Sequence, residues 1–289
     1  MASPRASAPT PHREVQGVRV PWLIYGTAWK EGRTASLTRQ ALDAGFRAID
    51  TANQRRHYHE AAVGEALASL FKGGTLRRED LFLQTKFTFL EGQDRPLPYD
   101  AEAPVPRQVE QSFESSLAHL GVDRLDAFVL HGPSLPEGLG RADWQAWEAM
   151  ESLQRAGRTL LIGVSNVTVS QLSALFGRAA VKPAVVQNRC FARPHADREV
   201  RAFCHAHEIA YQGFSLLTSR KSPVNHPEVR AIAGRMGKTP AQVVFRLAIE
   251  AGITVLTGTT SHAHMIEDLE APSLDPAASD LRAGLRLMD

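Results

Sequence analysis

Short apolar runs alternate with longer segments of helical period along almost the whole chain. The apolar runs, each predicted to form a strand, cover residues 23–25, 46–49, 81–84, 127–130, 160–164, 184–187, 209–212 and 253–256. Between them, apolar residues at helical spacing predict helices over 34–44, 60–70, 105–120, 142–156, 168–176, 197–206, 240–250 and 262–269, with a further one over 278–287. Residues 14–20, before the first run, predict a hairpin around Gly17.

This order of elements predicts a single closed barrel. Strands that are apolar throughout and alternate with helices are typical of a parallel sheet buried on both faces. Eight such repeats fit an α/β fold of the (β/α)8 TIM barrel type better than an open sheet, and they occupy residues 14–289 as one domain. We expect residues 1–13, which are rich in Ala, Ser and Pro, to form a disordered tail.

Two segments interrupt the regular spacing. Residues 88–106 form a proline-rich connection that is much longer than usual, and we expect it to be a wall or lid of a pocket. Residues 216–227 follow the seventh strand as a second irregular segment, which is a suitable position for a loop that clasps a ligand. Because the chain ends soon after the last predicted helix, we expect the pocket to be open or closed by residues 88–106.

Composition and charge narrow the possible partners. The chain has 289 residues, 43% of them hydrophobic and 22% charged, which suits one large barrel or two modest domains. Its net charge of +2 and the lack of a basic run interleaved with aromatic residues argue against a nucleic-acid partner. The start of the chain resembles neither a signal peptide nor a membrane span. Cys190 and Cys204 provide no disulfide framework, so we expect a cytoplasmic protein. We also expect a monomer or weak dimer.

Two clusters approach the spacing of metal ligands. They are Cys204, His205 and His207, and the pair His262 and His264. Both clusters fall in or beside predicted helices, where side chains two positions apart diverge. We therefore expect no metal site.

Three successive apolar runs lead into residues that carry chemistry. The second run ends at Asp50, the third leads to Lys86, and the fourth ends at His131. In a (β/α)8 barrel the carboxyl ends of the strands meet at one rim, where active sites lie. A buried carboxylate also requires a cation beside it, and Lys86 is a candidate. We therefore expect Asp50, Lys86 and His131 to converge on one site.

Several short motifs along the barrel resemble the aldo-keto reductase family. They appear in family order as GFRAIDTA at 45–52, EAAVGEAL at 60–67, TK at 85–86, SLAHLG at 116–121, LHGP at 130–133 and GVSN at 163–166. Each motif alone is weak, but the ordered series is strong, and the resemblance extends from GTAW at 26–29 to EDL at 267–269. A dinucleotide-binding Rossmann fold is disfavoured because no G-x-G-x-x-G follows the first strand.

The resemblance implies a reductase. In this family a reduced nicotinamide delivers hydride to a carbonyl carbon, a tyrosine protonates the oxygen, and a lysine lowers the pKa of that tyrosine. An aspartate pairs with the lysine, and a histidine orients the substrate. By resemblance, Asp50, Lys86 and His131 take these last three roles.

The proton donor is where the chain departs from the family. Two extra residues separate Asp50 from the helix that starts at Glu60, so the expected tyrosine position falls on Arg55 when counted forward and on His57 when counted back. Tyr58 is adjacent and is also a candidate. The count from the helix side favours His57 over Tyr58. If His57 is the acid, a substrate that arrives protonated, such as an iminium, depends less on a phenol, so imines join aldehydes and ketones as candidate substrates.

Family positions also suggest how the cofactor is held. Ser165, Asn166 and Gln187 match residues that hydrogen-bond the carboxamide, and Phe214 matches an aromatic residue that stacks on the nicotinamide. The remaining candidates for contact with the cofactor are Gly26, Thr27, Leu216, Gly258, Thr259, His264, Glu267 and Asp268.

The residues expected at the adenosine end of the cofactor also differ from the family pattern. The family's Pro-Lys-Ser and a following Arg are replaced by residues 257–260 and by His264, which removes the usual clamp on a 2′-phosphate. Arg220, Lys221 or His264 are possible substitutes, and we expect NADP(H) in preference to NAD(H).

The predicted function is an NAD(P)H-dependent oxidoreductase that reduces aldehydes, ketones or imines. One alternative is a catalytically silent barrel that binds nicotinamide and acts as a sensor or interaction subunit. A lyase or isomerase that uses Lys86 as a Schiff-base nucleophile is a third possibility, disfavoured because Asp50 would keep the amine protonated.

Overall fold

The computed structural model describes residues 10–191 and 194–288, and within them eight parallel strands close into a barrel. Neighbouring strands pair in the order β10, β3, β4, β5, β6, β7, β8, β9 and back to β10. Their bounds are β3 Leu23–Gly26, β4 Ala48–Asp50, β5 Phe82–Phe87, β6 Leu125–Leu130, β7 Thr159–Ser165, β8 Val185–Arg189, β9 Ala210–Phe214 and β10 Thr254–Thr257. The prediction of a single (β/α)8 barrel is confirmed.

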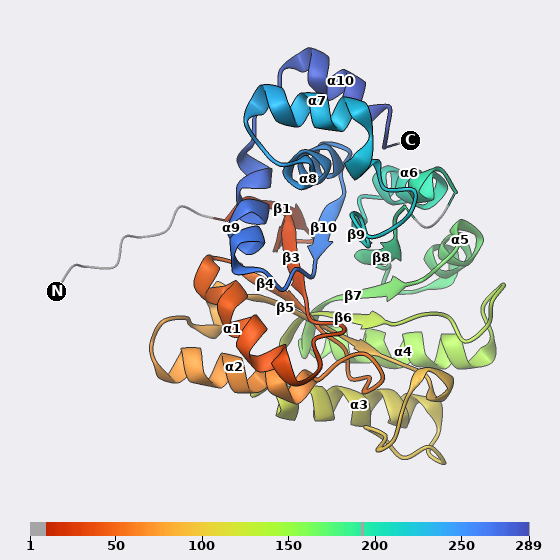
Figure 1. Ribbon diagram of the computed structural model, residues 1–289. Coiled ribbons are helices and arrows are strands. Elements are labelled where there is room, and N and C mark those ends of the chain that lie inside the picture. The colour runs from red at the N-terminus through yellow and green to blue at the C-terminus, as the bar shows by residue number, and fades with distance from the viewer. Residues whose placement is uncertain (1–9, 192–193, 289) are drawn as a thin grey trace.

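Helices form a layer around the strands (Figure 1). They are α1 Thr34–Ala44, α2 Glu60–Lys72, α3 Val105–Leu120, α4 Arg141–Arg155, α5 Val169–Arg178, α6 Arg198–Ala206, α7 Pro227–Met236, α8 Pro240–Glu250, α9 His262–Glu270 and α10 Ala278–Leu285. One cluster of buried apolar side chains lies between the strands and this layer, and a second lies inside the barrel, so apolar side chains of the strands are buried on both faces. All the predicted helices are present.

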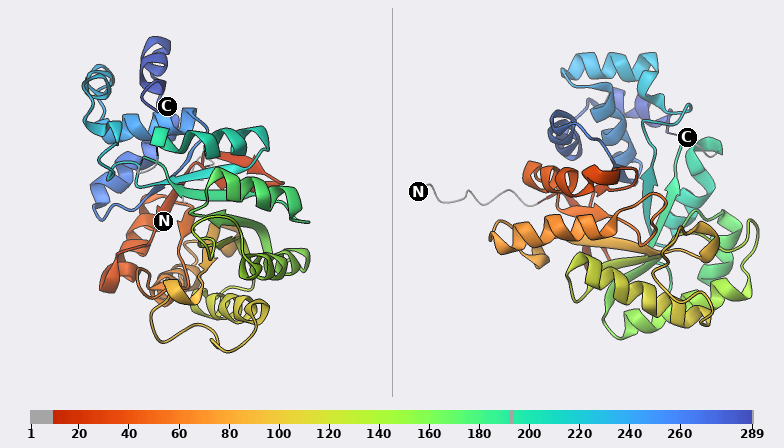
Figure 2. Two further views of the ribbon diagram at one scale, coloured as in Figure 1. Left: turned by 90° about the vertical axis from the view of Figure 1, so that its right-hand side faces the viewer. Right: turned by 60° about the horizontal axis from the view of Figure 1, so that its bottom comes forward.

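Helix α7 is an element that the sequence analysis missed. It starts with Pro227 behind His226, whose ring accepts a hydrogen bond from the Glu228 N–H, and it ends at Gly237 with a φ of 61°. It was missed because only three of its residues are both apolar and buried. Figure 2 shows α7 and α10 at one end of the molecule, beside the barrel.

The N-terminal end of the barrel is closed by a hairpin, as predicted. Strands β1 (His12–Val15) and β2 (Val18–Pro21) pair antiparallel around Gly17, which has a φ of 79°. Val15 and Val20 pack against the apolar side chains inside the barrel. The expected disorder of residues 1–13 is wrong for His12 and Arg13, which are paired in β1, while residues 1–9 lie outside the described part of the chain.

The opposite end carries the long loops. Residues 88–106 include a short 3-10 helix, Leu90–Gly92, and Tyr99 is buried with its hydroxyl donating to the Thr88 carbonyl at 2.8 Å. This anchor holds the segment against the barrel rim. Among the described helices, none is long and apolar enough to cross a membrane.

Candidate active site

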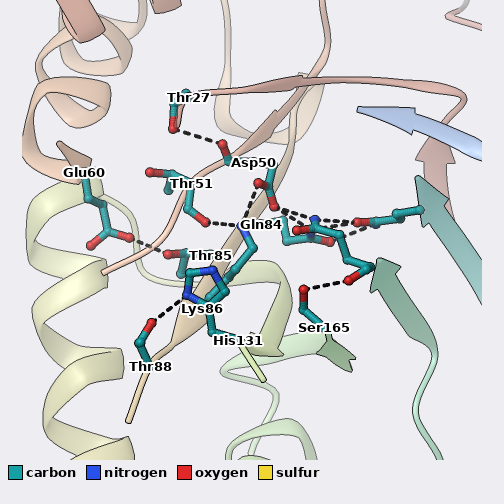
Figure 3. A network of polar contacts seen from close by, with 12 residues as sticks. Thr27, Asp50, Thr51, Glu60, Gln84, Thr85, Lys86, Thr88, His131 and Ser165 are labelled. Atoms are coloured by element: carbon teal, nitrogen blue, oxygen red, sulfur yellow. Dashed lines mark hydrogen bonds and ion pairs between the residues drawn. The ribbon is translucent and has the colours of Figure 1, made fainter. Parts of the chain in front are cut away.

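A buried ion pair lies at the carboxyl end of the barrel. Asp50 ends β4 and Lys86 lies near the end of β5, so the pairing of these adjacent strands brings their side chains together (Figure 3). Lys86 Nζ donates to Asp50 Oδ2 at 2.6 Å and to the Thr51 carbonyl at 2.8 Å. Burial is the largest single influence and alone would lower the pKa of Lys86, but the Asp50 carboxylate and Tyr58 together outweigh it, and the pKa lies above its ordinary value. Lys86 is therefore an ammonium in a dry interior.

Tyr58, and not His57, lies against this ammonium. Lys86 Nζ is 5.0 Å from the centre of the Tyr58 ring, and its positive charge works against the rise that burial causes in the pKa of the Tyr58 phenol. The Tyr58 ring also meets the His131 ring edge-on, with centroids 5.9 Å apart. His57 instead stacks on Trp29 at 4.0 Å, on the wall of the same cavity. The geometry therefore favours Tyr58 as the proton donor, against the order that the residue count suggested.

Hydrogen bonds between two loops explain how Tyr58 reaches Lys86. The loop with the extra residues is latched to the segment after β5: Gln54 Nε2 donates to the Gly92 carbonyl at 2.8 Å, and Gln93 Nε2 donates to the Asn53 carbonyl at 2.8 Å. Arg56 pairs with Asp94 at 3.0 Å on the outer side. A turn closed by the Tyr58 N–H and the Gln54 carbonyl takes up the extra length.

The neighbouring side chains set the proton affinity of Tyr58. Burial raises the pKa of Tyr58 above its ordinary value, and the Lys86 ammonium offsets part of that rise. The phenol is thus protonated at neutral pH, next to a cation that would stabilise its anion. Arg55, the third candidate from the count, is exposed and does not line this cavity.

His131 stands beside Tyr58 as a neutral imidazole. Burial, with Lys86 and His57 nearby, lowers the pKa of His131 to about 3. Its Nδ1 shares a hydrogen bond of 2.7 Å with Thr88 Oγ1. When Thr88 donates this bond, the ring proton lies on Nε2 and is available to an oxygen in the cavity.

The depressed pKa of His131 predicts a stability that falls in acid. Unfolding restores the ordinary value of 6.5, so between that pH and about 3 the unfolded chain holds a proton that the native chain does not. Stability from this group is complete above the unfolded value and declines as pH falls, by up to about 1.4 kcal/mol per pH unit. We expect His131→Asn to remove this slope in denaturant unfolding measured between about pH 7 and about pH 4. Parallel curves for the two proteins would contradict the assignment.

One cavity of about 1110 Å³ joins these groups to the residues proposed for the cofactor. Asp50, His57, Tyr58 and His131 line one part of it, while Lys86 is fully buried behind Asp50. The predicted cofactor residues that line it are Gly26, Ser165, Asn166, Gln187, Phe214, Leu216, Gly258, Thr259, His264, Glu267 and Asp268. The predicted cofactor residue Thr27 does not line the cavity, because it is fully buried and its hydroxyl donates to the Asp50 carbonyl at 3.0 Å.

Both irregular segments contribute to the cavity wall. Residues 88–92 supply Thr88, Phe89 and Glu91, and the segment after β9 supplies residues 216–218 and 224–225. The predicted substitutes Arg220 and Lys221 do not line the cavity.

The polar groups in the middle of the cavity are held in fixed directions. Ser165 Oγ donates to the Gln187 carbonyl at 2.6 Å, and Asn166 Nδ2 donates to the His131 carbonyl at 2.8 Å. Asn166 has a φ of 54°, and two further lining residues, Trp29 and Ser215, have φ values of 60° and 58°. Left-handed backbone at non-glycine residues is costly and gathers at functional sites.

The far end of the cavity mixes both signs of charge. Lys30 lines the cavity and donates to the Gly258 carbonyl, and Arg230 and His264 also line it. Against them stand Glu267 and Asp268. Burial raises the pKa of Asp268 to about 6, although Thr257 donates a hydrogen bond to it.

Several of these residues were missed from the sequence. Lys30 follows Trp29 directly after the first strand, and a lysine so close to a strand end was a usable signal. Gln84, a polar residue inside an apolar run, was another. Thr88 and Arg230 gave no local signal. Among residues 10–191 and 194–288, no group of three or more His, Cys, Asp or Glu could hold a metal ion.

Comparison with known proteins places this architecture among reductases. The family model described as "Aldo/keto reductase family" matches residues 24–223. The horse protein "Aldo-keto reductase family 1 member C23-like protein" (Equus caballus) is 28% identical, with 91% of this chain and 86% of that protein covered. A solved aldo/keto reductase from Brucella melitensis is 27% identical with a TM-score of 0.80, covering 96% of this chain and 99% of that one. A silkworm (Bombyx mori) aldo-keto reductase solved with NADPH is 25% identical with a TM-score of 0.81, covering 96% and 88%.

Proposed function

Because the chain belongs to the aldo/keto reductase family, a family of NAD(P)H-dependent oxidoreductases, we propose that it reduces aldehydes and ketones with Tyr58 as the proton donor. In this proposal Lys86, Asp50 and His131 complete the catalytic machinery. The observation that carries it is the position of the buried Lys86 ammonium, 5.0 Å from the centre of the Tyr58 ring, with the His131 ring edge-on to the same tyrosine.

The reaction follows from these neighbours. His131 Nε2 donates a hydrogen bond to the substrate's carbonyl oxygen and aligns it with the Tyr58 hydroxyl. As negative charge develops on that oxygen, the Tyr58 Oη–H bond breaks and the proton moves to it. Lys86 stabilises the phenolate that remains, and Asp50 keeps Lys86 charged and in position.

The residues in the cavity fit a nicotinamide cofactor, which when bound supplies the hydride. Gln187 Nε2 donates to Asp50 Oδ1 at 2.9 Å and to Gln212 Oε1 at 2.9 Å, so both its N–H groups are engaged. Its Oε1 remains to accept from a carboxamide NH2. Ser165 and Asn166 lie beside it, and the Phe214 ring offers an apolar face for stacking.

We further propose that NADP(H) is preferred over NAD(H). The silkworm relative was solved with NADPH, and Arg230 and His264 line the far end of this cavity. If Arg230 contacts the 2′-phosphate, Arg230→Ala raises the Kd for NADPH by about tenfold and changes the Kd for NADH much less. Fluorescence titration with both cofactors measures this. Equal losses for the two cofactors, or tighter NADH binding by the parent protein, would contradict the preference.

The experiment that tests the function is NADPH consumption across aldehydes, ketones and imines. We expect turnover of carbonyl compounds. Imines would be favoured if His57 were the acid, so turnover of imines alone would contradict the assignment of Tyr58. NADPH binding without turnover of any substrate would support the silent sensor instead, although that alternative depends on a missing phenol and Tyr58 contacts Lys86.

A further inference from the structure

Three glutamines inside the barrel surround the Asp50 carboxylate. Gln84 on β5, Gln187 on β8 and Gln212 on β9 are all buried there with it. We propose that Gln84 and Gln212 are positioning residues, which hold Asp50, and through it Lys86, in the arrangement that Tyr58 needs. The kinetic effects expected from this positioning role rest on the proposed function.

The hydrogen bonds of this network are continuous. Gln84 Nε2 donates to Asp50 Oδ1 at 2.7 Å, and Gln187 Nε2 donates to the same oxygen at 2.9 Å. The other N–H of each amide donates to Gln212 Oε1, both at 2.9 Å. Gln212 Nε2 returns a hydrogen bond to Gln84 Oε1 at 2.9 Å. Figure 3 shows Gln84 next to Asp50, on the side away from Thr51.

The chemistry of a carboxylate sets the direction of every bond. An ionised Asp50 can only accept, so Gln84 and Gln187 must both turn their NH2 groups toward it. Their second N–H groups then meet at one oxygen, and only an acceptor at Gln212 can satisfy both. Gln212 thereby fixes the two amides, and the amides fix Oδ1 while Lys86 holds Oδ2. The rotation of the carboxylate is fully determined.

Packing alone does not require these amides. The neighbouring part of the barrel interior is filled by apolar side chains, among them Ile24, Phe82 and Leu161. Buried glutamines cost free energy unless every polar group is satisfied, and apolar side chains could fill the same space, but they would leave Asp50 Oδ1 without donors. What the amides add is a set of donors on the oxygen that Lys86 does not reach.

The two glutamines should have separable effects. Gln84→Met removes one donor from Asp50 but leaves Gln187 bound to Asp50 and Gln212. With fewer donors, the negative charge of Asp50 is less dispersed and interacts more strongly with Lys86. The ammonium then stabilises the phenolate of Tyr58 less, which raises the pKa of Tyr58. Gln212→Met also frees Gln187, whose oxygen is the proposed contact of the cofactor carboxamide.

The test measures cofactor binding and the pH profile of kcat in both variants. We expect each variant to lower kcat by about tenfold. The decline of kcat at high pH, where Tyr58 loses its proton, should move up by about one pH unit. Only Gln212→Met should raise the Kd for NADPH, by about tenfold. Gln171→Met is the matched control, because Gln171 is also buried and donates to the Leu135 and Gly138 carbonyls, away from Asp50.

A second readout needs no turnover. The chain has four tyrosines, and the titration of Tyr58 is isolated by subtracting the phenolate absorbance of Tyr58→Phe from that of each protein. A higher pKa of Tyr58 in Gln84→Met supports the network even if the parent protein reduces no carbonyl compound. The positioning role of the glutamines and the proposed reductase function can therefore fail independently. If Tyr58 titrates in the Gln84→Met and Gln212→Met variants as it does in the parent protein, and these variants lose no more stability than Gln171→Met, then Gln84 and Gln212 have only a structural role and the proposal is wrong. If the methionine variants do not fold, Gln84→Asn, which keeps an amide of shorter reach, must show the same upward shift.

Discussion

Replacing Tyr58 with phenylalanine is expected to lower kcat for carbonyl reduction by between about 10²-fold and about 10⁴-fold. The change removes only the hydroxyl, so the ring keeps its contact with His131 and the cavity keeps its shape. The substitution therefore removes the hydroxyl proton that Tyr58 donates in the proposed reaction. Steady-state kinetics with NADPH and an aldehyde measures the effect, and the Kd for NADPH should change by less than about threefold.

His57→Ala is the comparison that distinguishes Tyr58 from His57 as the proton donor. His57 stacks on Trp29 and is only half-buried, and burial together with Arg56 lowers the pKa of His57. It is therefore neutral near pH 7 and part of a wall, so its loss should raise KM more than it lowers kcat. A His57→Ala enzyme that loses more kcat than Tyr58→Phe would return the role of acid to His57.

The position of the acid shows what the sequence could and could not predict. Asp50, Lys86 and His131 were predictable because each stands at the end of an apolar strand, and in a closed parallel barrel such ends share one rim. Tyr58 stands on a loop with extra residues, and counting does not say which way the added length turns. The direction is set by hydrogen bonds from Gln54 to residue 92 and from Gln93 to residue 53, which are long-range contacts.

The interior glutamines illustrate a second limit. Gln84 and Gln212 each end a predicted apolar run, which alone indicates only that something polar is buried. Their partners lie up to 128 residues away, so the network becomes visible only once the barrel has closed. The helix boundaries, in contrast, depend on local signals such as Thr239 before Pro240, and several were predicted to the residue.

Lys86→Met should impair both stability and catalysis, and the two losses should respond differently to a second substitution. Without Lys86 the Asp50 carboxylate is buried with no cation, and we expect the free energy of unfolding to fall by about 3–5 kcal/mol. The double variant Lys86→Met with Asp50→Asn has no charge left at this ion pair, and it should recover most of that loss.

Activity should not recover with stability. In both variants the phenolate of Tyr58 has no ammonium beside it, so kcat should stay at least about 10²-fold below the parent protein. Denaturant unfolding and steady-state kinetics on the three proteins separate the two effects. Equal destabilisation of the single and double variants would mean that Asp50 is not left as an unpaired charge, and activity in the double variant would mean that Lys86 acts only to neutralise Asp50. Because Lys86 also donates to the Thr51 carbonyl and lies 5.0 Å from the centre of the Tyr58 ring, we expect neither result.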